Sequence, residues 1–250
     1  MTEYKITVTP EEHLNLLEIS EDQNFKVHKE KMIMMGAHML ALIESHPEIM
    51  KHWIFGIDAS LKSFVTLEKK KEIIIDLEQI KWDNPIYKYR LKMFEEGKEE
   101  PAVKGFIYTT DIEEVFRYEA EKKKLELKNN KPKITDLEVY KKIISPYCAN
   151  LHIDESLYKE KYGEKISGMI VLFKEIGKLY NYLAKDSKTY IYSGQRYESF
   201  LTSIDDESFE IIGEKSETKT FKGIEFTNLE LLIKNSGGLI AKSTVIVSAF

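Results

Sequence analysis

Hydrophobic and polar residues follow first a strand period and then a helix period near the N-terminus. Residues Tyr4–Val8 alternate and predict a short strand. The segment Thr9–Glu12 predicts a helix start, because its threonine can cap the helix, proline fits the first turn and carboxylates favour the positive end of the helix dipole. A second helix is predicted over residues 25–44, before Pro47. Its segment Met32–Ile43 is apolar on nearly every side, so we expect it to be buried all round or covered by a partner.

Shorter apolar runs separated by turn residues mark the middle of the chain. Two strands are predicted at Ser63–Leu67 and Glu72–Asp76, with the basic run Lys69–Lys71 as the tip of a hairpin. The segment Glu95–Pro101 is dense in charge and contains glycine and proline, which indicates a loop or linker. Gly105–Thr109 predicts another strand.

Helical patterns dominate the next part of the chain. A helix is predicted from Asp111 to about Leu127 and is broken by residues 129–132. Thr135–Glu138 has the spacing of a capping box and predicts a helix reaching about Ile144. The clearest helix is Glu164–Ala184, where apolar residues recur at spacings of three and four.

The last quarter of the chain is rich in strand patterns with glycine at the turns. Strands are predicted at residues 189–193, 208–213, 218–226, 229–234 and 239–250. The expected fold class is therefore α+β, with helix-rich N-terminal and central parts and a mostly antiparallel C-terminal β-sheet. Residues 1–100 form a mixed helix and strand region and residues 101–250 an α+β region with the C-terminal sheet. The boundary between them is weak, and a single domain remains an alternative. No repeat with a period of 20 to 50 residues is visible.

Composition narrows the class of protein. The net charge of −5 and the pI near 5.8 argue against a surface built for polyanions. A single cysteine, Cys148, excludes an internal disulfide and zinc sites that need several cysteines. The N-terminus lacks the pattern of a signal peptide, and the longest apolar run is too short to span a bilayer. We therefore expect a cytoplasmic protein without a membrane partner.

Only three of the 37 basic residues are arginines, namely Arg90, Arg117 and Arg196. Lysine lacks the planar fork with which arginine binds phosphates and bases, so base readout is disfavoured. The lysine bias indicates an AT-rich bacterial or viral genome. Glycine cradles for phosphates, the His-Glu-x-x-His motif and the Gly-x-Ser-x-Gly motif are absent from the sequence.

One spacing is typical of a magnesium-dependent nuclease. Asp58 is followed by Glu68 and Lys70, and an aspartate with Glu-x-Lys on a strand can hold magnesium while the lysine orients the attacking water. Lys69, at the position between the glutamate and the lysine, is charged where an apolar residue is usual, and the same spacing recurs elsewhere in this Lys- and Glu-rich chain. A solvated hairpin tip is the structural alternative.

Two further groups of side chains are candidates for chemistry. Cys148, His152 and Asp154 lie close in sequence and could form a thiol, imidazole and carboxylate set, although a small buried cysteine is by far the commoner explanation. Five histidines, His13, His28, His38, His46 and His52, cluster before Trp53 and suggest a metal site, but no two of them are four residues apart. A core histidine bonded to a carbonyl is the common explanation for His38.

Basic and aromatic residues alternate at one place. Lys88, Tyr89, Arg90 and Lys92 have the interleaving that a groove for single-stranded nucleic acid would use, although acidic residues flank the lysine runs elsewhere. The leading hypothesis is a non-enzymatic interaction or regulatory protein with a protein partner or a homo-oligomer and without a cofactor. The alternatives are a magnesium-dependent nuclease that uses Asp58, and a sequence-independent nucleic-acid-binding protein.

Overall fold

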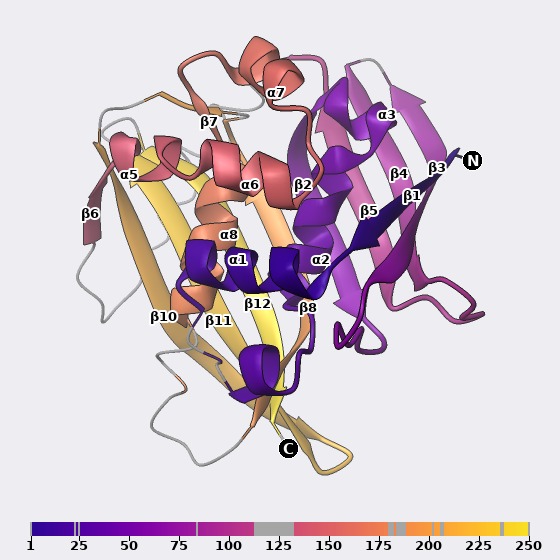
Figure 1. The fold of residues 1–250 in the computed structure, drawn as a ribbon. Helices are drawn as coiled ribbons and strands as arrows, with labels where there is room; N and C mark the ends of the chain where they lie inside the picture. Colours follow the sequence, from indigo (N-terminus) through magenta and orange to yellow (C-terminus); the bar gives the residue numbers. More distant parts are fainter. Residues whose placement is uncertain are drawn as a thin grey trace.

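A computed structural model describes residues 2–22, 24, 26–83, 85–112, 133–179, 183, 189–201, 203–205, 208–235 and 238–249. Arg117 and the helix predicted up to Leu127 lie largely outside these residues. Within them, the chain forms one ten-stranded antiparallel sheet with helices packed on one face (Figure 1). The strand order is β1-β3-β4-β5-β2-β8-β12-β11-β10-β6.

The strands of the large sheet come from the whole length of the chain. They are β1 (Thr2–Val8), β2 (Trp53–Leu61), β3 (Lys71–Asp83), β4 (Ile86–Glu95), β5 (Val103–Thr110), β6 (Lys133–Asp136), β8 (Tyr190–Ser199), β10 (Ser208–Phe221), β11 (Ile224–Asn235) and β12 (Gly238–Ala249). A separate two-stranded sheet pairs β7 (Ile166–Ser167) with β9 (Ser203–Ile204).

The sheet consists of two halves with the same internal order. From its outer edge, the first half runs β1-β3-β4-β5-β2 and the second runs β6-β10-β11-β12-β8. The innermost strands β2 and β8 pair antiparallel and join the halves, with Gly56 opposite Glu198 and Ser60 opposite Gly194. The same five-stranded arrangement therefore occurs twice, once in each half of the chain. A duplication of this length lies beyond repeat periods of 20 to 50 residues, so the absence of a repeat at those periods is compatible with it.

The helices fill the space on one side of the sheet. They are α1 (Pro10–Ser20), the π-helix η1 (Lys26–Glu30), α2 (Gly36–Ala41), the 3-10 helix η2 (Leu42–Ser45), α3 (Pro47–Met50), α5 (Leu137–Lys141), α6 (Ile144–Asn150), α7 (Glu155–Tyr162) and α8 (Gly168–Leu179). Every residue of α8 except Lys178 is buried, because α1 and α2 cover it on one side and the sheet on the other (Figure 1).

The expectation of helix-rich N-terminal and central parts is wrong. Five of the ten strands of the large sheet lie before residue 111, and β3 and β4 form a long hairpin where only one short strand was expected. These strands carry buried apolar residues on one face and mostly charged residues on the other, and their many charges favoured a solvated segment over a strand. The strand β5 pairs with both β2 and β4, so one continuous sheet extends across residue 100.

The first two predicted elements are confirmed at the level of their hydrogen bonds. β1 covers the predicted strand and pairs with β3. Thr9 caps α1, with its Oγ1 accepting from the Glu12 N–H at 3.2 Å while the Glu12 carboxylate accepts from the Thr9 N–H at 2.7 Å. This reciprocal pair satisfies two backbone donors that would otherwise have no partner.

The long helix predicted over residues 25–44 is wrong, whereas the burial of its apolar segment is confirmed. The segment contains η1, an extended stretch, α2 and η2 in succession. All residues from Met34 to Ser45 are buried, with Met35 and Met39 at 0% and 1% exposure. Gly36 lies so close to the ring of Tyr192 in β8 that a Cβ there would come within 2.2 Å of it. Tertiary packing against the sheet therefore determines the shape of this segment.

Three other predicted boundaries differ from the structure. Residues 63–67 form only an isolated bridge between Thr66 and Ile33, and the Lys69–Lys71 run leads into β3 rather than forming a hairpin tip. Asp136 rather than Thr135 accepts the capping hydrogen bond of α5, from the Glu138 N–H at 2.9 Å. The predicted helix over residues 164–184 is observed as α8, preceded by the short strand β7.

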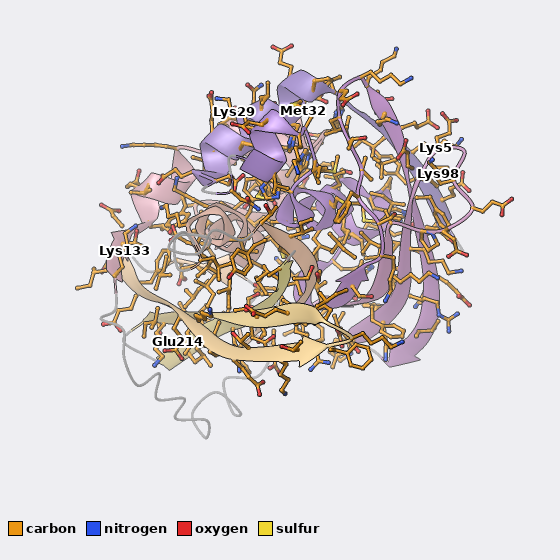
Figure 2. The ribbon with its side chains drawn as sticks, turned by 90° about the horizontal axis from the view of Figure 1, so that it is seen from below. Lys5, Lys29, Met32, Lys98, Lys133 and Glu214 are labelled. Atoms are coloured by element: carbon orange, nitrogen blue, oxygen red, sulfur yellow. The ribbon has the colours of Figure 1, made fainter. Side chains whose placement is uncertain are left out.

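The C-terminal strand is confirmed as an interior strand. β12 pairs with β8 on one side and β11 on the other. Val245 and Val247 are fully buried on one face and Ile246 lies on the opposite face. The edges of the sheet are instead β1 and β6, and Figure 2 shows Lys5 of β1 and Lys133 of β6 on opposite sides of the molecule. Among the described residues, no helix is long and apolar enough to cross a membrane.

Candidate active site

A buried aspartate and histidine meet directly after α1. The chain leaves α1 through Glu21, whose φ of 52° turns the backbone, and Asp22 follows. One turn of π-helix then brings His28 back, so that its Nδ1 lies 2.6 Å from Oδ2 of Asp22. Each of the two side chains is only 2% exposed. A carboxylate this close and this well shielded from water binds the Nδ1 proton of the imidazole strongly.

Residues from the second half of the chain hold this turn in place. Oδ1 of Asp22 accepts from the Asn24 N–H at 3.0 Å, and the Asn24 amide donates to the carbonyl of Tyr190 in β8 at 2.7 Å. The helix α8 lies close behind, because a Cβ on Gly177 would come within 2.9 Å of the Asp22 Cα. The Asp22 and His28 pair therefore sits where α1 of the first half meets α8 and β8 of the second.

Lysines of α8 fix the residue before Asp22. Lys174, itself buried, donates to the carboxylate of Glu21 at 2.5 Å and to the carbonyl of Ile19 at 3.3 Å. Lys178 lies 3.4 Å from the same carboxylate. The hydrogen bond from Lys174 lowers the pKa of Glu21, with the charge of Lys178 as a smaller contribution. These contacts anchor the end of α1 to α8.

Two further buried histidines extend from His28. The ring Nε2 of His13 lies 3.0 Å from the carbonyl oxygen of His28, and Nδ1 of His13 lies 3.4 Å from Nδ1 of His38. Burial lowers the pKa of His13 to about 4 and holds the pKa of His38 well below its usual value, so both rings are neutral at pH 7.

The partners determine which ring nitrogens carry protons. A carbonyl oxygen only accepts, so Nε2 of His13 must donate and its Nδ1 must accept. His38 then donates from Nδ1, and its Nε2 is left as a buried acceptor without a hydrogen-bond partner among the described residues. The chain of donors runs from His38 through His13 to the backbone of His28, which fixes the position of the His28 ring relative to Asp22.

The predicted nuclease residues lie on the outer surface. Asp58 in β2 is exposed and lies 3.6 Å from the guanidinium of Arg196 in the neighbouring strand β8. Glu68 and Lys70 are exposed in the segment that precedes β3. No group of three or more potential metal-ligating side chains was found in the part of the chain that the structure describes, and this applies to the histidine cluster as well.

The predicted nucleic-acid groove is divided between two faces of β4. Successive side chains of a strand point to opposite faces. Tyr89 is therefore buried at 4% exposure, while Lys88, Arg90 and Lys92 lie on the other face. Lys88 packs over the ring of Phe106, and Arg90 pairs with Glu78 at 2.5 Å. The tyrosine cannot stack a base in the same groove as the cations.

The predicted cysteine constellation does not assemble. Cys148 is buried, and burial raises the pKa of its thiol to about 12, so the reactive thiolate is disfavoured at neutral pH. Nε2 of His152 pairs with the carboxylate of Glu12 at 2.9 Å. Asp154 caps α7 by accepting from the Ser156 N–H at 2.9 Å. Each residue therefore has a separate structural role.

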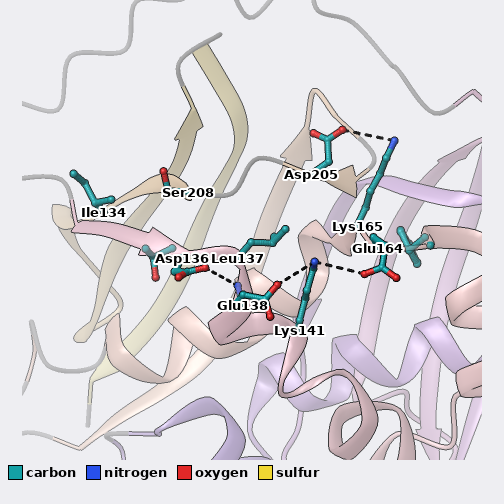
Figure 3. Close-up of a pocket in the computed structure, with 12 residues that line it drawn as sticks. Ile134, Asp136, Leu137, Glu138, Lys141, Glu164, Lys165, Asp205 and Ser208 are labelled. Atoms are coloured by element: carbon teal, nitrogen blue, oxygen red, sulfur yellow. Dashed lines mark hydrogen bonds and ion pairs between the residues drawn. The ribbon is translucent and has the colours of Figure 1, made fainter.

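An open pocket of about 930 Å³ lies between β6, α5 and the segment before β7 (Figure 3). Its charged side chains are largely paired with one another. Lys141 lies 3.1 Å from Glu138 and 3.6 Å from Glu164, and Lys165 lies 3.8 Å from Asp205. Because Glu138 and Glu164 are well exposed, these pairs are solvated and weak. This pocket contains no acid–base pair comparable to Asp22 and His28.

Sequence reasoning missed Asp22 and His28 as a pair. His28 belongs to the histidine cluster, but it lies six positions after Asp22, a spacing at which neither a helix nor a strand brings two side chains into contact. Only the π-helix and the turn at Glu21 bring them together. Residues 21–31 are mostly charged or polar and resemble a solvated loop, so the sequence carries no signal that these two side chains are buried.

The arrangement of the sheet is that of a double hotdog fold. The chain is similar over 100% of its length, with a TM-score of 0.64 and 6% identity, to 96% of a conserved hypothetical protein from Mycobacterium tuberculosis that is described as having this fold. It is also similar over 98% of its length to 94% of a MaoC-like dehydratase from Phytophthora capsici, with a TM-score of 0.60 and 9% identity.

A third similar structure is described by a different activity from the dehydratase. A candidate thioesterase from Novosphingobium aromaticivorans matches with a TM-score of 0.57 and 10% identity, over 98% of this chain and 94% of that one. No family model and no curated protein matches the sequence. At these identities the likeness establishes the double hotdog fold.

The similar structures overturn the leading functional hypothesis. The similar structures whose activity is named are described as dehydratases and a thioesterase, and none of these is described as an interaction or regulatory protein. The geometry corrects the two alternatives. Asp58 is exposed and belongs to no group of metal-ligating side chains among the described residues, and Tyr89 lies on the opposite face of β4 from Lys88. Asp22 and His28 come into contact only in the folded chain, so the sequence alone did not bring them forward as a candidate pair.

Proposed function

We propose that the protein is a hydratase or dehydratase that adds or removes water next to a carbonyl group, with His28 and Asp22 as its acid–base pair. The observation that carries the proposal is the 2.6 Å contact between these two buried side chains. The fold that it shares with MaoC-like dehydratases supports the same chemistry.

The strength of the base limits the class of substrate. An imidazole can remove a proton from carbon only where a neighbouring carbonyl stabilises the resulting negative charge. A β-hydroxyacyl thioester meets this requirement, and a thioester is also the substrate class implied by the name of the candidate thioesterase. We therefore propose a β-hydroxyacyl thioester as substrate and an enoyl thioester as product.

The proposed reaction balances as an elimination of water. In the neutral ring, Nδ1–H of His28 donates to Asp22, and Nε2 carries the lone pair that takes the proton from the α-carbon. The electron pair of the C–H bond becomes the new C=C bond as the β-hydroxyl leaves. The imidazolium returns its proton to the departing hydroxyl, which completes a water molecule. Asp22 stabilises the transient positive charge of the ring.

The test is hydration of an enoyl thioester such as crotonyl-CoA. The reaction is monitored through the loss of the ultraviolet absorbance of the conjugated thioester. We expect Asp22→Asn and His28→Asn to lower kcat by about 100-fold to 10,000-fold, the usual contribution of acid–base catalysis. His52→Asn is the matched control, because His52 and Asp111 form a second His and Asp pair at 2.5 Å near the surface. That variant should keep its activity.

Two results would contradict this assignment. Equal activity of the Asp22 and His28 variants and the His52 control would remove the pair from catalysis. Release of free thiol without loss of the double bond, measured with a thiol reagent, would indicate a thioesterase instead.

The partner and location of the protein stay proposals. A homo-oligomer is supported by apolar side chains that remain exposed in the single chain, such as Ile134 at 72% and Phe221 at 64%. Light scattering that returns the monomer mass of 29.2 kDa at micromolar concentration would contradict it. A cytoplasmic location also remains a prediction, which fractionation of the host cell tests.

A further inference from the structure

A second group of buried ionisable side chains lies apart from Asp22 and His28. Glu44 of η2 is only 7% exposed. Its Oε2 accepts from the hydroxyl of Tyr147 in α6, and its Oε1 accepts from the hydroxyl of Ser167 in β7 at 3.2 Å. Burial raises the pKa of Glu44, and the two hydroxyl donors oppose that change. The proposed hydratase reaction has no use for this carboxyl group.

Lys161 of α7 lies near the same carboxyl group. Its ammonium donates to the carbonyl oxygen of His52. Lys161 and Glu44 both line a small cavity of about 20 Å³, which is large enough for one water molecule. Burial lowers the pKa of Lys161 to about 8, while the negative charge of Glu44 acts in the opposite direction. A large fraction of this lysine is therefore a neutral amine at mildly alkaline pH.

A larger pocket gives access to this lysine. It has a volume of about 750 Å³, lies between α3 and α7 and shares Met50, Leu157 and Lys161 with the small cavity. Figure 1 shows α3 and α7 at the same end of the molecule. Tyr4 and Trp53 add apolar wall to the pocket, and its volume lies in the range of small-molecule sites. The rim of the pocket also carries charged side chains, among them Asp154 and Glu160, so Lys161 lies between an open pocket of mixed character and a buried carboxyl group.

We propose that Lys161 is a reactive amine that condenses with a small aldehyde or ketone carrying an apolar chain, admitted through the pocket between α3 and α7. The neutral amine attacks the carbonyl carbon and a C–N bond forms. Nitrogen gives up both of its protons in turn. Glu44 takes each proton and passes it to the former carbonyl oxygen, which first becomes a hydroxyl and then leaves as water when the C=N bond forms. One amine and one carbonyl compound thus give one imine and one water.

The rate advantage of Lys161 follows from the difference between its pKa of about 8 and the ordinary 10.5. At pH 7 the neutral fraction of Lys161 exceeds that of an ordinary lysine by about 300-fold. The less basic amine is also a weaker nucleophile, which removes part of this gain. The net advantage is on the order of tenfold.

The experiment treats the intact protein with propanal and sodium cyanoborohydride at pH 7 and maps the propylated lysines by peptide mass spectrometry over time. Lys51 is the internal control, because it lines the same pocket but is exposed and paired with Glu48 at 2.8 Å. We expect Lys161 to be labelled about tenfold faster than Lys51. Labelling of Lys161 at the rate of Lys51 or more slowly would overturn the proposal.

A variant separates reactivity from simple exposure. Glu44→Gln removes the charge that raises the pKa of Lys161, so the midpoint of the pH dependence of labelling should move to lower pH. An unchanged midpoint would show that Lys161 does not interact with Glu44. Asp22→Asn should label at the wild-type rate, because the imine chemistry does not depend on the proposed hydratase pair.

Discussion

Gly177 is the point at which α8 allows the Asp22 turn to approach. An alanine Cβ at this position would lie 2.5 Å from the carbonyl oxygen of Ser20 and 2.9 Å from the Cα of Asp22. Both contacts are with backbone, so the end of α1 must move by several tenths of an ångström or more. Overpacking of this kind costs about 1 to 3 kcal/mol, and the better helix propensity of alanine offsets about 1 kcal/mol of it. We expect Gly177→Ala to lower the free energy of unfolding by up to about 2 kcal/mol.

The larger effect should fall on activity. A displacement of about 1 Å at a catalytic pair can lower the rate by about 100-fold. Urea unfolding measures the first quantity, and hydration of an enoyl thioester measures the second. Gly56→Ala is a control, because its nearest contact is the side chain of Tyr108 at 3.1 Å, which can shift. A Gly177→Ala protein with wild-type activity and unchanged stability would refute the close approach of α8 to Asp22.

Three further predictions concern stability. Thr9→Ala removes the cap of α1 and should lower the free energy of unfolding by about 1 kcal/mol in urea titration. Burial lowers the pKa of His13 from 6.5 to about 4. As the pH falls, the unfolded chain therefore takes up this proton before the folded chain does. About 3 kcal/mol of the free energy of unfolding is lost between pH 6.5 and pH 4. His13→Gln can keep the hydrogen bond to the His28 carbonyl and should flatten this pH dependence; an equally steep curve would contradict it. Deleting the last six residues removes the buried Val245 and Val247, each worth about 1.5 to 3 kcal/mol, and should lower the melting temperature. An unchanged melting temperature would show that this end of β12 does not contribute to stability.

Local sequence determined those elements whose signals come from neighbouring residues. The cap of α1 needed only Thr9 and Glu12, because both hydrogen bonds close within four residues. The burial of the apolar segment around Met35 and Met39 followed from composition alone, because so many apolar side chains cannot be left in water. The position of β12 inside the sheet followed from apolar residues on both of its faces.

Only the tertiary structure decided the arrangement of the sheet and the contact between Asp22 and His28. The first half of the sheet was missed because strands such as β3 and β4 carry charge on one face, and their stability comes from pairing with strands far away in sequence. Asp22 and His28 became a site because α8 and β8, about 150 residues later, fix the turn between them through Gly177 and Tyr190. Hydrogen bonds of this geometry depend on positions in space, and spacing along the chain does not encode them.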